Sequence, residues 1–134
     1  MEYILIHTDA QGATHLSEKT WETHDGMFTP PSPAGYTITD TMHSNGVLMM
    51  HHPAGYRDAW HCAPAPVLGT VLSGNVRIAA SGGQHRVLEP GMQFVAADLT
   101  GAGHKMEEIL LRPYSLVLVV LDERDEILAG YIGE

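Results

Sequence analysis

Glycine and proline interrupt this chain so often that they limit the length of any regular element it can form. The 134 residues include 14 glycines and 8 prolines. Between them lie apolar or alternating runs of about five to eight residues, a length that fits β-strands better than helices. We therefore predict an all-β fold, and an apolar share of 44% is enough for one hydrophobic core. A single domain over residues 1–134 is expected.

The runs between these breaks predict ten short strands. The turn sequences SerGly at 73–74, SerGlyGly at 81–83 and ProGly at 90–91 separate consecutive runs and predict antiparallel neighbours. So many short strands in one small domain leave two architectures, a two-sheet sandwich or a closed double-sheet barrel of the jelly-roll type. The predicted strands are 3–7, 14–16, 36–42, 47–52, 67–72, 75–80, 85–88, 93–97, 104–109 and 114–121.

Two segments do not follow the strand pattern. Residues 27–36 include the stretch TPPSPAG, whose three prolines cannot enter a sheet interior, and they predict an ordered loop or a lid. Residues 122–131 place acids ahead of apolar residues at helical spacing, and they predict a short C-terminal helix.

Charge and composition limit the partners and the compartment. Lysine and arginine number 7 against 16 acids, which gives a net charge of -9 and no basic stripe for nucleic acid. The longest apolar run, 116–121, is far shorter than the roughly 20 residues that cross a bilayer, so no membrane partner is expected. The single cysteine cannot form an internal disulfide, and the first ten residues lack the features of a secretion signal. We therefore expect a cytoplasmic protein.

The residues from Gly55 to Gly74 keep a recognisable spacing. Five residues separate Gly55 from His61, and one residue separates His61 from Ala63. Three residues then separate Ala63 from Val67, and six separate Val67 from Gly74. This frame resembles the first motif of the cupin superfamily. In metal-binding cupins, a second histidine and a glutamate stand where this chain has Ala63 and Val67.

A second segment extends the resemblance. Gly101 and His104 match the glycine-to-histidine step of the second cupin motif, whereas Leu99 and Glu108 stand where a proline and an asparagine are expected. Together with WHCAP at 60–64, LSG at 72–74 and PG at 90–91, the chain is similar to small single-domain bacterial cupins. The resemblance implies a jelly-roll barrel in which His61 and His104 meet at one pocket.

The alternation of side chains along extended segments agrees with a pocket that contains His61 and His104. His61, Ala63 and Val67 fall on one face, and His104 and Glu108 fall together in the later segment. Cys62 has the opposite parity, so we interpret it as a small buried hydrophobe and not as a nucleophile.

A metal site at His61 and His104 needs a third ligand, for which His51 and Glu108 are the candidates. Either would complete a set for one divalent transition metal, namely iron, zinc, nickel or manganese. The alternative is that the histidines bind a ligand or water without metal, in a pocket made more apolar by Ala63 and Val67.

The function predicted from these residues is the binding of a small molecule in the barrel. The protein is then either a metal-assisted enzyme of the dioxygenase, isomerase or lyase type, or one whose histidines act as general acid and base. His61, His104 and Glu108 are the catalytic candidates, and Met49, Arg57, Trp60 and Val67 are expected to contact the substrate. The alternative is a metabolite-binding or sensing module without catalysis. A homodimer is predicted because strands such as 116–121 carry more apolar surface than one small barrel buries.

Overall fold

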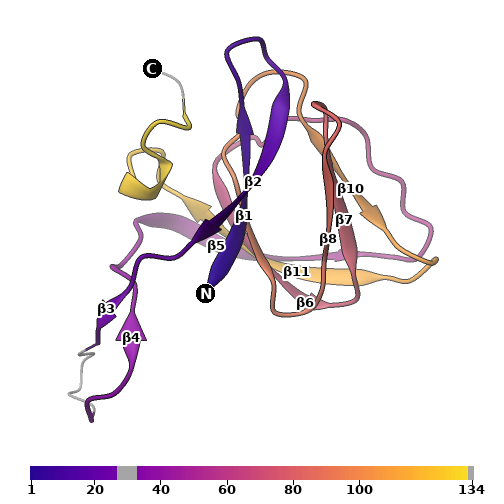
Figure 1. Ribbon diagram of the computed structural model, residues 1–134. Helices are drawn as coiled ribbons and strands as arrows, with labels where there is room; N and C mark the ends of the chain where they lie inside the picture. Colours follow the sequence, from indigo (N-terminus) through magenta and orange to yellow (C-terminus); the bar gives the residue numbers. More distant parts are fainter. Residues whose placement is uncertain (27–32, 133–134) are drawn as a thin grey trace.

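The computed structural model describes residues 1–26 and 33–132, and these residues form an all-β fold (Figure 1). The prediction of an all-β fold is therefore confirmed. The elements are β1 Glu2–Thr8, β2 Thr14–Thr20, β3 His24–Asp25, β4 Thr37–Ile38, β5 Ser44–His52, β6 Val67–Ser73, β7 Val76–Ala80, β8 His85–Leu88, β9 Gln93–Ala96, β10 His104–Glu108, β11 Tyr114–Leu121 and the 3₁₀ turn η1 Glu126–Leu128.

The strands form two main sheets and a small ladder. The six-stranded sheet has the order β2-β1-β9-β6-β11-β5, the three-stranded sheet has the order β10-β7-β8, and β3 pairs with β4. All pairs are antiparallel except β1 with β9, which run parallel. Within the described residues, the two main sheets do not join into a closed barrel.

Of the three short turns, the SerGlyGly turn joins hydrogen-bonded neighbours. β7 and β8 pair antiparallel across it. β6 and β7 lie in different sheets, and so do β8 and β9. The prediction of antiparallel neighbours is therefore wrong for the turns at 73–74 and 90–91, because a tight turn reverses the chain without choosing the sheet that the next strand joins. These two turns carry the chain from one sheet to the other.

In the strands of the two main sheets, alternate residues point into the space between the sheets. In β1, Ile4 and Ile6 are buried on this inner face, while Tyr3 and Leu5 point to the outer face. The Phe94 ring of β9 lies over Gly69 of β6, where a Cβ would overlap with it. The inner cluster consists of Ile4, Ile6, Leu16, Ala63, Val71, Val76, Ile78, Ala80, Leu88, Phe94, Ala96, Met106, Tyr114, Leu116 and Leu118.

The C-terminal segment covers part of the outer face of the six-stranded sheet. Leu128 is buried there with Tyr3, Leu5 and Trp21. Asp125 caps the 3₁₀ turn by accepting a hydrogen bond from the Ile127 amide at 3.0 Å. The helix predicted at 122–131 is thus reduced to one turn, since Gly130 takes a positive φ of 83° and ends the helical geometry.

The strand predicted at 36–42 is largely wrong. Only Thr37 and Ile38 pair, with His24 and Asp25 of the unpredicted strand β3. The propensity of this run favours a strand, but residues 39–43 pair with no strand among the described residues. Of the loop or lid predicted at 27–36, residues 27–32 lie outside the described residues. No helix in the described ranges has the length and apolar character needed to traverse a bilayer.

Candidate functional site

Residues 57–61 run beside β10 and bring His61 next to His104. His61 and His104 exchange both backbone hydrogen bonds, each at 2.9 Å, and a second bridge joins Arg57 to Glu107. Directly opposed residues of an antiparallel pair lie on one face, so the two imidazoles share a face. Gly103 makes this approach possible, because a Cβ at its positive φ of 82° would overlap with the His61 carbonyl oxygen. The predicted meeting of the two histidines is present in the structure.

The two β-bridges are unequally spaced on the two chains, and this changes the face on which the side chains of residues 57–61 lie. Four steps along the chain from Arg57 to His61 face three steps of β10 from Glu107 to His104. An extra residue of this kind is a bulge, and it changes which face the following side chain occupies. Arg57 therefore lies with Glu107 on the outer face, whereas His61 lies with His104 on the inner face.

His104 forms a buried hydrogen bond with Asp98. The distance from His104 Nδ1 to Asp98 Oδ2 is 2.6 Å, and the side chains are 3% and 0% exposed. Asp98 is the second residue after the end of β9, and its carbonyl accepts a hydrogen bond from the Ala63 amide at 3.0 Å. The other carboxylate oxygen, Oδ1, is buried and has no hydrogen-bond partner among the described residues. A buried carboxylate held this way is unusual, because most buried polar atoms are paired.

His61 lies beside His104 and nearer the surface. The two ring centroids are 4.7 Å apart with an interplanar angle of 54°, and the His61 side chain is 44% exposed. Its Nδ1 donates to the Ala59 carbonyl oxygen at 2.7 Å and lies 3.6 Å from Asp58 Oδ2. His61 thus lies between the buried His104 ring and the solvent.

The hydrogen bonds fix the same tautomer in the neutral form of both rings. A carboxylate and a carbonyl oxygen can only accept, so Nδ1 carries the proton in both His104 and His61. Each Nε2 is then left with a lone pair that can take a proton, accept a hydrogen bond or bind a metal. Histidines that act as bases or as metal ligands are typically oriented by such a bond from the other ring nitrogen.

The site supplies two metal ligands, which is one fewer than a tight transition-metal site requires. No group of three or more histidine, cysteine, aspartate or glutamate side chains is placed to hold a metal ion in the described part of the chain. Iron, zinc, nickel and manganese are bound by at least three protein ligands in catalytic sites. The residues present at His61 and His104 therefore do not fit a tightly held metal.

The inner face of β5 carries a second polar group of residues. A hydrogen bond joins His52 Nδ1 to the Tyr114 hydroxyl, and the His52 ring lies 4.3 Å from the Tyr56 ring. Burial raises the pKa of the fully buried Tyr114, with a smaller contribution from the charge of Asp58. Burial also lowers the pKa of His52. Both groups are therefore neutral near pH 7.

The structure places His51 and Met49 away from this face. In β5 both residues are exposed on the outer side, and His51 Nδ1 lies 3.0 Å from Ser115 Oγ. The strand alternates, so His52 is the histidine that points inward. His51 is therefore not brought to His61 and His104, and Met49, 70% exposed, does not line the inner face.

The remaining predicted site residues are divided between the two faces. Trp60 is 49% exposed, with the Lys105 ammonium 4.9 Å from its ring centroid, and like Arg57 it lies outside. Val67 packs against the inner cluster. Glu108 accepts a hydrogen bond from the Arg112 amide at 2.9 Å and so holds the turn that leads to β11. Cys62 donates its thiol to the Gly101 carbonyl at 3.0 Å.

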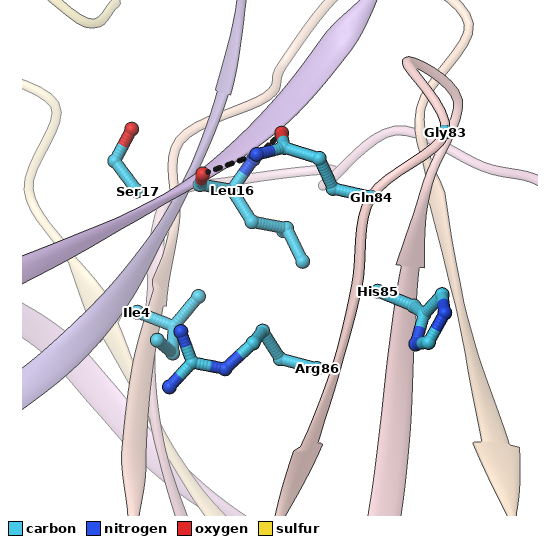
Figure 2. Close-up of a pocket in the computed structure, with 7 residues that line it drawn as sticks. All are labelled: Ile4, Leu16, Ser17, Gly83, Gln84, His85 and Arg86. Carbon is cyan, nitrogen blue, oxygen red and sulfur yellow. Dashed lines mark hydrogen bonds between the residues drawn. The ribbon is translucent and has the colours of Figure 1, made fainter.

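A cavity of about 280 Å³ opens between β2 and β8, the edge strands of the two sheets (Figure 2). Gln84 bridges these edges, since its Oε1 accepts from the Leu16 amide at 2.8 Å and its Nε2 donates to the Leu16 carbonyl at 3.2 Å. Figure 2 shows the Arg86 side chain extending toward Ile4. The cavity is slightly smaller than most ligand pockets and is lined by neither His61 nor His104.

The chain matches no protein-family model and no curated protein. Sequence reasoning missed Asp98, although one signal was available. Asp98 is a lone acid that directly follows the apolar run FVAA, and an acid in such a position is buried only when it has a partner.

Proposed function

We propose that this chain is a cupin-type jelly-roll domain that binds a small molecule at His61 and His104. The resemblance of its motifs and the two facing sheets, joined by turns that cross between them, support this assignment. The reaction we propose is proton transfer on the bound molecule, with His104 as general base and Asp98 as its positioning residue. The observation that carries the proposal is the 2.6 Å bond between buried His104 Nδ1 and Asp98 Oδ2.

The chemistry follows from the tautomer. His104 Nε2 removes a proton from the ligand, and the Asp98 carboxylate stabilises the imidazolium that forms. The proton returns from Nε2 to a different atom of the same ligand, so the net reaction is an isomerisation without a further reactant. A carbon next to a carbonyl group is the proton donor best suited to an imidazole base, which makes an enolisable carbonyl compound the expected substrate class. His61, half exposed beside His104, has the lone pair of its neutral Nε2 free and accepts a hydrogen bond from a hydroxyl of the ligand or of its enol form.

Deuterium exchange tests this proposal without knowledge of the natural substrate. Acetylacetone and a panel of 2-oxo acids are incubated with the protein in D₂O, and NMR measures the incorporation of deuterium next to the carbonyl group. Exchange should exceed the buffer rate with the native protein and fall to that rate in His104→Gln. His51→Gln is the matched control, because this histidine lies on the outer face and its loss should change nothing.

The outcomes separate the alternatives. Equal exchange in His104→Gln and the native protein would exclude His104 as the base. Binding without exchange of any compound would favour the non-catalytic metabolite-binding module. Elemental analysis of untagged protein tests the metal-assisted alternative, which predicts close to one iron, zinc, nickel or manganese per chain.

We also propose that two copies of the chain associate through β5. This strand lies at the edge of the six-stranded sheet, and its outer face exposes Val47 and Met49 by 62% and 70%. An exposed apolar edge strand is a template for pairing with another chain. The strand SNGVLMMHH contains no Asp, Glu, Lys or Arg, so two copies meet there without the repulsion that a net charge of -9 creates elsewhere.

A further inference from the structure

A second cavity lies on the outer face of the six-stranded sheet, on the side opposite the histidine pair. Its volume is about 680 Å³, which is within the range of small-molecule pockets. Its walls come from β1, from the end of β2 and the residues after it, from residues 39–43 and from the C-terminal segment. We call it the outer groove. It shares no lining residue with the site of His61, His104 and Asp98.

Aromatic rings form one side of the outer groove. Tyr3 and Trp21 pack with their ring centroids 4.2 Å apart, and each is 8% exposed. The Trp21 indole is fixed by its Nε1, which donates to Gln93 Oε1 at 3.0 Å. The Tyr131 ring accepts a cation within the protein itself, since the Lys19 ammonium lies 5.7 Å from its centroid. Three aromatic residues thus line the groove, and a positive charge is already placed against one of their rings.

Carboxylates outnumber the single lysine in the lining. Four acids and one lysine line the groove, and two of the acids have structural partners. Asp125 caps η1 and accepts from the His43 amide, and Asp40 pairs with His24 at 2.9 Å. Glu22 and Glu126 form no ion pair with the described residues. Two carboxylates are therefore available to a ligand at the edge of an aromatic surface.

We propose that the outer groove binds a small organic cation with an aromatic or apolar body, of the arylalkylamine class. The body would lie against Tyr3, Trp21 and Tyr131, and the ammonium group would meet Glu22 and Glu126. Charge complementarity selects this class, because a neutral ligand of the same shape gains no charge–charge attraction from the carboxylates and an anionic one is repelled by them. The proposal is independent of the function assigned to His61 and His104.

NMR titration with phenethylammonium tests the proposal on the whole protein. The probe is compared with 2-phenylethanol and 3-phenylpropionate, which keep the ring and replace the charge by none or by a negative one. The readout is the Trp21 indole N–H signal, identified because Trp60→Phe removes the only other tryptophan signal. Phenethylammonium should shift this signal saturably, and the double substitution Glu22→Gln and Glu126→Gln should raise its Kd about fivefold or more.

The control and the opposing outcomes are defined by the same titration. Glu123→Gln removes an exposed acid of the neighbouring segment that does not line the groove, and it should leave the Kd unchanged. Equal affinity for the three probes would overturn the selection of a cation. Absence of a saturable Trp21 shift, or shifts confined to His104, would overturn the groove as the binding site.

Discussion

Replacing Asp98 by asparagine keeps the shape of the side chain and removes its charge. Asp98 is fully buried, its Oδ2 accepts from His104 Nδ1 at 2.6 Å, and its Oδ1 has no partner among the described residues. The amide of the Asp98→Asn variant has two orientations. With its oxygen toward His104, it buries an NH₂ group at the position of Oδ1, an atom that is hydrogen-bonded to none of the described residues. With its NH₂ group toward His104, it forces Nδ1 to accept, so the proton moves to Nε2 and the base is lost.

Both orientations weaken the folded state. Hydrogen bonds to charged groups contribute about 1.5–3 kcal/mol, and a buried unpaired donor costs about 1–3 kcal/mol. Removing the charge also relieves the cost of burying a carboxylate, which acts in the opposite direction. Because the contact is short and both side chains are almost completely buried, we expect the loss to dominate, at about 1.5–3 kcal/mol of unfolding free energy. In a domain of this size, this lowers Tm by roughly 5–15 °C.

Urea denaturation and imidazole nitrogen NMR measure the two effects separately. The unfolding free energy should fall in Asp98→Asn, and the control Glu89→Gln, an exposed acid, should change it by less than about 0.5 kcal/mol. The NMR spectrum should place the His104 proton on Nδ1 in the native protein. A variant that is as stable as the native protein, or more stable, and keeps the same tautomer would show that Asp98 does not hold His104.

Three further predictions concern other parts of the molecule. Burial lowers the pKa of His52 in the folded state, so the unfolded state binds a proton at a higher pH than the folded state does. The unfolding free energy should therefore decrease as the pH falls from 7 to 5, and it should decrease less steeply in His52→Gln. A methyl group at Gly69 would overlap with the Phe94 ring, so Gly69→Ala should cost roughly 1–3 kcal/mol by thermal unfolding, and Phe94→Leu in the same chain should recover part of the loss. Met49→Glu places charges at the proposed β5 interface and should convert a dimer to a monomer in sedimentation equilibrium; a native protein that is already monomeric at high concentration would contradict the dimer.

The strands were the most predictable part of the fold. β8 and β11 have the bounds expected from the sequence, and most other strands differ by one to four residues. The alternation of side chains between the two faces of β1 and the strand breaks at glycine and proline depend on local sequence, so they can be predicted from it. The pairing of β1 with β9 is not local, because residues 4–6 meet residues 94–96 across most of the chain. No periodicity within either run indicates that partner.

The sequence predicts the two histidines of the candidate site, but not the face on which each neighbouring side chain lies. Motif spacing brought His61 and His104 together correctly, since the two residues face each other directly in a β-bridge. The choice of His51 over His52 failed as a matter of parity, because an adjacent pair puts one side chain on each face and the sequence does not say which. Arg57 was expected to contact the substrate beside His61, but the bulge between the two residues puts their side chains on opposite faces. Asp98 belongs to no motif; the apolar run before it indicates a buried acid, but only the structure shows that its partner is His104.

The parallel pairing of β1 with β9 also restricts how this chain can fold during synthesis. β1 lies between β2 and β9, so its first neighbour is complete by Thr20, whereas its second neighbour is not complete until Ala96. One row of backbone groups in the β1–β2 hairpin therefore stays unpaired while 76 further residues are made. β11, the last strand of the six-stranded sheet in chain order, is synthesised later still. Folding of the sheet is for this reason a late and cooperative event, and a chain ending before β9 would leave its first strand open to pairing with other chains.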